Sequence, residues 1–249
     1  LEEEGIRFRL DARAERVEAR DGAKVVHTDG GRELEVDEIF VATGRRPAID
    51  GLELERAGVR TEDGAVVVDD RLRTSNRGVW AAGDVTGGMQ FTHLADAMAK
   101  TVLRNALIPG SAAMDYSNVP RVTYTDPELA DIGLSQEEAD ARGGTTYTYG
   151  LDDLDRAIVD GNARGLVKVH TDKKGRILGA SILGVHAGEL LLPLVMARTH
   201  GLKLSDISDT IFPYPTMMEG VKRAADAYQR TRLDGVGGTL LKKVISWLK

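Results

Sequence analysis

The chain has 249 residues and carries 33 Lys and Arg against 39 Asp and Glu, so its net charge is −6. That length supports one large domain or two ordinary ones, and the acidic balance disfavours nucleic-acid binding, which normally requires a basic patch. The chain contains no cysteine, which excludes a disulfide scaffold, a thiolate nucleophile and an iron–sulfur cluster made by these residues alone.

The first forty residues predict a β-meander that leads into a more buried strand. Alternating apolar and polar residues, with a turn at Asp29-Gly30-Gly31, indicate antiparallel pairing. The predicted strands cover residues 5–10, 14–18, 24–28 and 38–42. A meander of this kind is typical of the end of an α/β domain and is too small to fold alone.

The next segment begins with a connection rich in Gly and Pro at residues 43–47. Strands are predicted at residues 66–68 and 78–82. A helix is predicted from Thr92, its expected N-cap, to just before Pro109, because apolar residues recur there at helical spacing.

Beyond about Tyr116 the pattern changes to α+β. Ser135-Gln136-Glu137-Glu138 has the sequence of a capping box, and His27 and His170 fall in strand patterns that predict surface positions. The predicted strands cover 121–124, 145–150, 165–171 and 176–184. A short helix is predicted from Ser135, and three further helices are predicted at 188–198, 216–232 and 240–248. The last helix is amphipathic, which favours a docked helix over a membrane anchor at this length.

The strongest functional signal is Gly83-Asp84-Val85, directly after the strand at 78–82. Small residues let a ligand approach the backbone closely, and Asp84 offers acceptors to a sugar-like polyol. The helix that begins near Thr92 directs free N–H groups and a positive dipole end toward the same place. Such a site suits a ribityl chain and a ring edge that becomes anionic on reduction, although a strand-to-helix turn with a capping Asp explains the local spacing equally well.

Three further motifs are ambiguous one by one. Residues 42–47 permit a close backbone approach at Gly44, but alone they are better interpreted as a loop, and residues 124–128 are a strand end followed by a turn. In residues 212–220, two prolines hold Tyr214 in a stiff segment before a helix. A capping box formed by Thr216 and Glu219 explains Glu219 well, but it does not explain the presented tyrosine.

Together and in this order, these motifs resemble the C-terminal half to two-thirds of the FAD-dependent pyridine nucleotide–disulfide oxidoreductases. That family includes dihydrolipoamide dehydrogenase, glutathione reductase and mercuric reductase. The resemblance implies the end of a Rossmann-like α/β region that binds two dinucleotides, followed by an α+β dimerisation domain. The implied domains are residues 1–43 for the end of the NAD(P)-binding domain, 44–115 for the end of the FAD-binding domain, 116–232 for dimerisation and 233–249 for a tail helix.

The resemblance also implies which residues contact FAD and NAD(P)H. Asp84 is expected on the ribityl hydroxyls, Thr92 and His93 at the flavin pyrimidine edge by backbone contact, and Val122 near the nicotinamide. The implied cofactor-binding residues are Gly44, Gly83, Asp84, Phe91, Thr92, His93 and Val122. No metal site is predicted, since no pair of histidines has metal-ligand spacing.

The segment around Tyr214 is most similar to that of mercuric reductase and its relatives. Disulfide reductases usually have His-Pro-Thr-x-x-Glu there, whereas Tyr214 takes the position of the His and Glu219 is kept. An imidazole with a pKa near 6.5 can exchange a proton with a thiolate at neutral pH, but a phenol with a pKa near 10 cannot. The substitution disfavours dithiol or disulfide reduction and favours reduction of a metal ion such as Hg(II) or of another small acceptor.

The resemblance implies that Tyr214 and Glu219 are catalytic and reach the cysteine pair of the other subunit in a homodimer. The first FAD fingerprint, the cysteine pair and the NAD(P)-binding glycine motif are expected upstream of Leu1. We therefore expect a cytoplasmic flavoenzyme of which this chain is an inactive portion with two incomplete cofactor sites. A mercuric reductase also has two vicinal cysteines near its C-terminus, which this chain lacks. The alternatives are a non-catalytic homodimerisation module and a quinone or other small-acceptor reductase of the same family.

Overall fold

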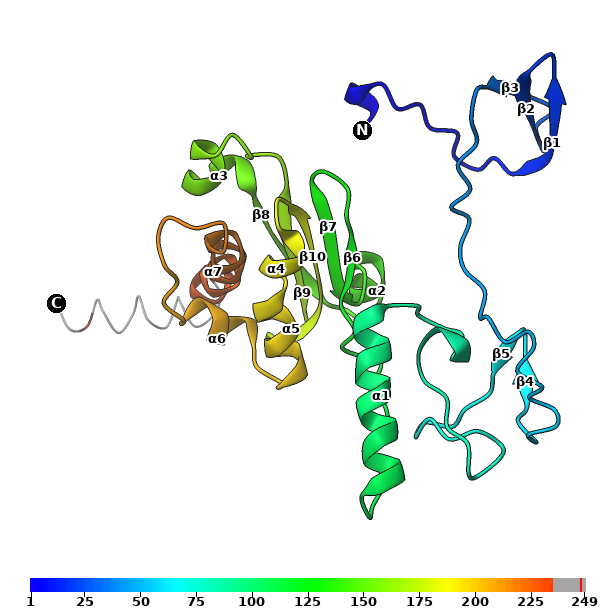
Figure 1. Ribbon diagram of the computed structural model, residues 1–249. Coiled ribbons are helices and arrows are strands. Elements are labelled where there is room, and N and C mark those ends of the chain that lie inside the picture. Colours follow the sequence, from blue (N-terminus) through cyan, green and yellow to red (C-terminus); the bar gives the residue numbers. More distant parts are fainter. Residues whose placement is uncertain (235–246, 248–249) are drawn as a thin grey trace. The chain divides into compact units, whose positions relative to one another are not determined.

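A computed structural model describes residues 1–234 and residue 247 (Figure 1). The chain forms two compact units. The first contains Leu1–Val68 and Arg73–Ala95, and the second contains Asp69–Leu72 and the chain from Asp96 onward. None of the described helices is long and apolar enough to cross a bilayer. The helix expected at 240–248 lies outside the described residues, apart from Trp247.

The first unit begins with a short 3₁₀ turn, η1 (Glu2–Glu4), and a three-stranded antiparallel sheet. The strands are β1 (Ala14–Arg20), β2 (Ala23–Thr28) and β3 (Glu33–Val36), paired in that order. The strands expected at residues 5–10 and 38–42 are not formed. In the described part of the chain, no strand pairs with residues 38–42, and an unpaired strand would leave its backbone polar groups unsatisfied. Phe40, in this segment, is 92% exposed.

The rest of this unit has little regular structure. A two-residue turn joins β4 (Thr61–Glu62) to β5 (Ala65–Val66), and the 3₁₀ turn η2 (Gly83–Thr86) precedes α1 (Thr92–Leu107). Only the first four residues of α1 belong to this unit. The strand expected at 78–82 is reduced to one bridge between Trp80 and Arg73. The Arg73 guanidinium lies 4.4 Å from the centre of the Trp80 ring, so a cation–π contact accompanies the single backbone pairing.

The second unit is an α+β domain built on a five-stranded antiparallel sheet with the order β6-β7-β10-β9-β8. The strands are β6 (Arg121–Thr123), β7 (Glu128–Gly133), β8 (Thr145–Gly150), β9 (Leu166–Thr171) and β10 (Ile177–Gly184). Strands at β6, β8, β9 and β10 were predicted. The strand β7 was missed, because Glu128 and Asp131 interrupt its apolar residues.

Helices connect and cover this sheet. They are α2 (Gln136–Ala141), η3 (Leu151–Asp153), α3 (Asp155–Val159), α4 (Ala187–Leu190), α5 (Leu192–Thr199), α6 (Leu204–Ser208) and α7 (Glu219–Asp234). The Ser135 capping box is confirmed, with both reciprocal hydrogen bonds formed. The helix expected at 188–198 is divided at Leu191, two residues before Pro193, whose missing N–H cannot continue the helical hydrogen bonds.

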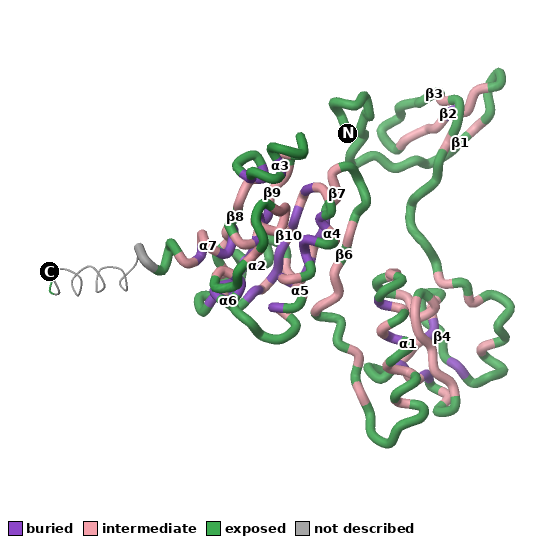
Figure 2. Tube along the Cα trace, turned by 60° about the vertical axis from the view of Figure 1, so that its left-hand side comes forward, coloured by how far each residue is buried: buried purple, intermediate pink, exposed green. Residues whose placement is uncertain are grey.

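The core lies where the sheet meets α4, α5 and α7 (Figure 2). Alternate residues of β9 and β10 face these helices, namely Val167, Val169, Ala180 and Ile182, and each is at most 1% exposed. One face of the sheet is thus fully covered, as the alternation of apolar residues requires.

His170 contradicts the predicted surface position. It lies in β9, is only 1% exposed, and its Nδ1 is 2.8 Å from the Thr146 hydroxyl. Burial lowers the pKa of His170, because the charged imidazolium loses its hydration there.

The pH dependence of stability follows from this burial. The unfolded chain takes up the His170 proton near pH 6.5 while the folded chain resists it, so the free energy of unfolding decreases as the pH falls below about 6.5. Urea unfolding at pH 8 and pH 5 should show a smaller loss of stability at pH 5 for His170→Gln than for the unchanged chain. His200→Gln, at an exposed helix end, is the control, and an equal loss for both variants contradicts the prediction.

Candidate functional site

Tyr214 lies in the segment between α6 and α7, and its side chain is 68% exposed. Its hydroxyl donates a hydrogen bond of 2.8 Å to Oδ2 of Asp155. Asp155 is the first residue of α3 and is 59 residues away in the sequence. The tyrosine is therefore presented at the surface and held at its polar end by a carboxylate.

The pKa of Tyr214 is raised, mainly because the Asp155 carboxylate accepts its proton in a hydrogen bond and repels the phenolate charge. Glu219 adds to the repulsion, and Arg223 opposes it weakly. The group therefore remains a neutral phenol at neutral pH. It can donate a hydrogen bond there, but it cannot act as a base, as expected from the sequence.

Glu219 is the first residue of α7, and its side chain is 12% exposed. It lies 3.9 Å from Arg223, one turn further along the helix, and a carboxylate is favoured at a helix N-terminus. The predicted capping box is wrong, because the Thr216 hydroxyl donates backward to the Pro213 carbonyl at 2.8 Å and α7 begins only at Glu219.

Two residues near this segment were not singled out from the sequence. Asp155 fixes Tyr214, and the Tyr149 hydroxyl donates a 2.6 Å hydrogen bond to the carbonyl of Asp153. Burial raises the pKa of Tyr149, and the charge of Glu219 contributes in the same direction. No local pattern could have identified Asp155, because only the tertiary fold brings α3 beside the segment before α7.

The Gly83–Asp84 turn lies in the first unit. Gly83 has φ +78°, and a Cβ at this position would be 3.1 Å from Cβ of Ala95 on α1, so only glycine allows this turn to lie against the helix. Asp84 is exposed, and the N–H groups in the first turn of α1 have no partner within the helix. An exposed carboxylate beside a helix N-terminus fits the ribityl and ring portion of a flavin, so the residues present fit part of an FAD site.

The other predicted cofactor residues of this unit gather near the start of α1. The Arg45 guanidinium donates to the Gln90 carbonyl at 3.4 Å, which brings the residue after Gly44 beside that helix end. The rings of Phe91 and His93 stack with their centres 5.2 Å apart. The predicted N-cap is displaced by one residue, since the Ala95 N–H bonds to the Phe91 carbonyl and Thr92 is already helical.

Val122 belongs to the second unit, on β6, where it is half-buried and packs against the core. A Cβ on Gly188 would be 3.4 Å from its methyl group. Val122 therefore lies next to the turn that opens α4, which also carries a group of polar side chains that the sequence did not predict.

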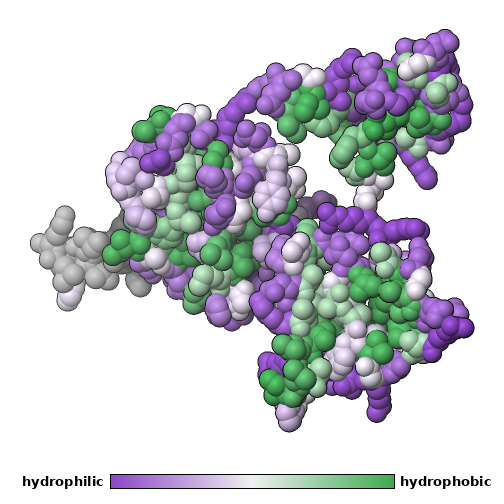
Figure 3. All heavy atoms as spheres, viewed as in Figure 1, coloured by the Kyte–Doolittle hydropathy of each residue, from purple (hydrophilic) through white to green (hydrophobic). Residues whose placement is uncertain are grey.

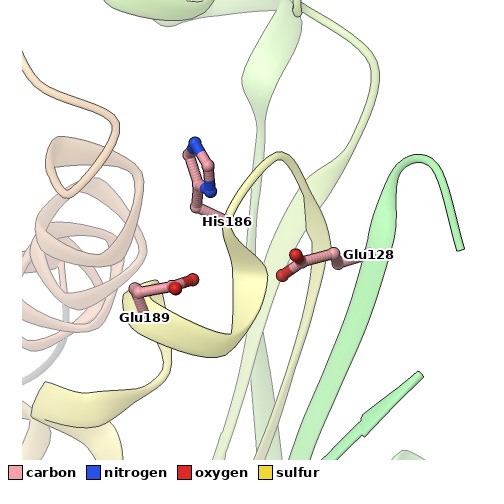
Figure 4. Close-up of side chains that lie close together, drawn as sticks. All are labelled: Glu128, His186 and Glu189. Carbon is pink, nitrogen blue, oxygen red and sulfur yellow. The ribbon is translucent and has the colours of Figure 1, made fainter. Parts of the chain in front are cut away.

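That group consists of Glu128, His186 and Glu189 (Figure 4). One oxygen of each carboxylate and one ring nitrogen of the histidine lie within 4.8 Å of one another. His186 is the N-cap of α4 and has a left-handed backbone conformation, and Glu189 lies in the first turn of that helix. Glu128 comes from β7 and has no sequence relation to them.

Two protein-family models match the chain. Residues 1–99 match the pyridine nucleotide-disulphide oxidoreductase model, and residues 119–225 match the dimerisation domain of the same proteins. The chain is 39% identical over 236 residues to a mercuric reductase of Streptomyces lividans, covering 91% of this chain and 49% of that protein. It is 38% identical over 239 residues to a dihydrolipoyl dehydrogenase of Thermus scotoductus, covering 92% of this chain and 51% of the relative.

A solved structure agrees with these matches. The HOCl-induced flavoprotein disulfide reductase RclA from Escherichia coli superposes with a TM-score of 0.84 at 33% identity, over 90% of this chain and 53% of that one. The chain thus spans about half the length of the relatives it matches. On these matches and the fold of its second unit, the chain belongs to the pyridine nucleotide-disulphide oxidoreductases, a family of flavoproteins that use FAD and NAD(P)H.

Proposed function

We propose that this chain is the C-terminal half of a cytoplasmic FAD-dependent NAD(P)H oxidoreductase that reduces a small acceptor, with Hg(II) as the favoured acceptor. Its residues 1–43 end the NAD(P)-binding domain, residues 44–115 end the FAD-binding domain, residues 116–232 dimerise and residues 233–249 form a tail. When bound, NAD(P)H and FAD would supply two electrons that reduce a disulfide of a cysteine pair, and the resulting dithiol would reduce the acceptor. The chain contains no cysteine, so alone it is inactive.

The observation that carries this proposal is the hydrogen-bonded phenol of Tyr214, in a chain that matches mercuric reductases at 34–39% identity. If its single O–H proton leaves the Asp155 carboxylate, the neutral phenol can donate a hydrogen bond to a thiolate that holds a thiophilic metal ion. It does not supply the base that dithiol oxidation or disulfide reduction needs at neutral pH. The electrostatics around Tyr214 therefore favour a metal ion or another small acceptor over a disulfide.

In the intact enzyme, some residues of this chain would bind the cofactors and others would act on the acceptor. Asp84 accepts hydrogen bonds from a polyol, and the N–H groups at the start of α1, around Phe91, Thr92 and His93, offset negative charge on the flavin ring edge. Gly44 and Gly83 would leave room for the cofactor, and Val122 would contact the nicotinamide. Tyr214 and Glu219 act on the acceptor at the other subunit's cysteine pair.

The same proposal requires a homodimer, and the surface of α5 supports one. Leu192 and Met196 are 56% and 54% exposed and lie one turn apart on the same side of that helix, whereas Leu194 and Ala197 are buried. Apolar side chains reach the surface of the molecule at several places (Figure 3). We propose that Leu192 and Met196 form part of the dimer contact. A stable dimer that never binds flavin would instead identify a non-catalytic homodimerisation module.

The first test replaces Tyr214 with Phe in the full-length enzyme. Removing the hydroxyl should slow reoxidation by the acceptor by at least about 100-fold, because a positioned proton donor contributes roughly 10²–10⁴-fold. Flavin reduction by NADPH should be unchanged. Stopped-flow absorbance resolves the two half-reactions, with mercury-dependent NADPH oxidation as the steady-state assay.

Tyr147→Phe is the matched control, because that tyrosine packs against the core rather than in the exposed segment. Equal slowing of both half-reactions by Tyr214→Phe would refute the assigned role. Activity with a disulfide but none with mercury would refute the favoured acceptor.

A second test measures the hydrogen bond directly. Asp155→Asn keeps an acceptor oxygen but removes the charge that repels the phenolate, so the pKa of Tyr214 should fall toward its ordinary value near 10. Absorbance at the tyrosinate band is titrated for each protein and for its Tyr214→Phe counterpart, and the difference isolates Tyr214. Asp160→Asn, which removes the carboxylate that pairs with Arg156, should leave the titration unchanged. A shift in that control and not in Asp155→Asn would contradict the assignment.

A third test addresses the dimer. The double substitution Leu192→Asp with Met196→Asp introduces buried charge at the proposed contact and should raise the dimer dissociation constant at least about tenfold in analytical ultracentrifugation. Leu103→Asp, at an apolar residue of α1 that is 61% exposed, should have no such effect. A dimer unaffected by the double substitution would place the interface elsewhere.

A further inference from the structure

We propose that Glu128, His186 and Glu189 form a binding site for one divalent transition-metal ion such as Zn²⁺. The inference rests on these three side chains in the second unit and is independent of the oxidoreductase function proposed above. The imidazole nitrogen and the carboxylate oxygens are common zinc ligands, and three protein ligands with an open position for water make a complete site.

The backbone fixes where each ligand starts. Glu128 begins β7 and is paired with Gly184, the last residue of β10. His186 follows two residues later as the N-cap of α4, and Glu189 lies in the first turn of that helix. The three ligands therefore come from one rigid corner, where the β10 ladder turns into α4.

The Glu128 side chain is further held toward this corner. Its Oε2 accepts a hydrogen bond of 3.2 Å from the Gly188 N–H. This hydrogen bond holds one carboxylate oxygen against the backbone of α4, and the second oxygen remains available to a ligand. One of the three ligands is thus oriented before any ion binds.

The donor atoms are already close to ligand spacing. They lie within 4.8 Å of one another, and two ligands of one tetrahedral zinc ion are roughly 3.4 Å apart, given bonds of about 2.1 Å. His186 and Glu189 are exposed, so small side-chain rotations close the remaining gap. Figure 4 shows the carboxylates of Glu128 and Glu189 directed toward each other, while the His186 ring extends away from them at the start of α4.

Charge also favours a cation at this position. Two carboxylates that face each other at this distance repel, and a divalent ion between them reverses the sign of that interaction. The imidazole adds a nitrogen donor, which selects zinc-like ions over Mg²⁺ or Ca²⁺, since those prefer oxygen ligands alone.

The site adjoins the segment that carries Tyr214. His186 lines a surface pocket of about 360 Å³ together with Pro215, Thr216 and Met217. An ion held by His186 would therefore lie at the rim of a pocket wide enough to admit a small ligand to the open coordination position.

The test is a calorimetric titration of Zn²⁺ into the chelator-treated 249-residue chain. We expect one ion per chain and at least about tenfold weaker binding in each of His186→Gly, Glu128→Gln and Glu189→Gln. Glycine suits the φ of 56° at position 186, and Gln at 128 can still accept the Gly188 hydrogen bond, so these variants should fold normally, as circular dichroism will verify.

Two matched controls remove exposed groups of the same kind elsewhere. His200→Gly and Glu137→Gln should leave the Zn²⁺ affinity within about twofold, because neither residue belongs to the group. Co²⁺ offers an independent readout, since its visible absorption on binding should be lost in His186→Gly. No saturable binding below about 1 mM Zn²⁺, or binding that survives in His186→Gly, would overturn the proposal.

Discussion

The side chain of Leu151 is the contact on which the architecture of the second unit depends. Leu151 is fully buried at the end of β8, and a Cβ on Gly165, Gly184 or Gly220 would lie 2.9, 2.7 or 3.1 Å from its methyl groups. Three glycines from β10, from the start of α7 and from the segment before β9 therefore close around one leucine. A side chain at any of these three positions would collide with Leu151, so the glycines allow the three elements to pack closely around it.

Both polar sites take their geometry from this packing. Gly220 places the start of α7 against the sheet, and Glu219 and the Tyr214 segment come immediately before it. Leu151 itself begins η3, which leads directly into α3 and Asp155. Gly184 ends β10 opposite Glu128, two residues before His186. A change at Leu151 would therefore move the phenol, its carboxylate partner and the three-ligand corner together.

The sequence predicted those parts of the fold that local pattern determines. Alternating residues identified four of the five strands of the large sheet, and the Ser135 capping box was correct because both of its partners lie within four residues. Residues 38–42 failed because an apolar run becomes a strand only beside a partner. The surface position predicted for His170 was wrong because the alternation of residues along β9 does not show which face of the sheet is covered by other elements.

The residues of the candidate sites also fall into those that a local sequence pattern identifies and those that only the fold brings together. Tyr214 and Glu219 are visible in the sequence because they belong to one continuous motif, and so are Gly83 and Asp84. Asp155 and Glu128 are not, because their partners lie 59 and about 60 residues away and only the sheet brings them together. Local motifs identify the groups that perform chemistry, whereas the groups that set their charge are known only from the fold.

That division bears on the choice of acceptor. Asp155 and Glu219 surround Tyr214 with negative charge, which keeps the phenol protonated and disfavours an anionic acceptor at this surface. A cationic acceptor is attracted by the same charges. Carboxylate oxygens are hard ligands, however, and a thiophilic ion prefers thiolates, so these carboxylates attract such an ion without capturing it. In the proposed enzyme the cysteine pair of the other subunit would bind the ion, and Tyr214 would exchange its hydrogen bond to Asp155 for one to a thiolate of that pair.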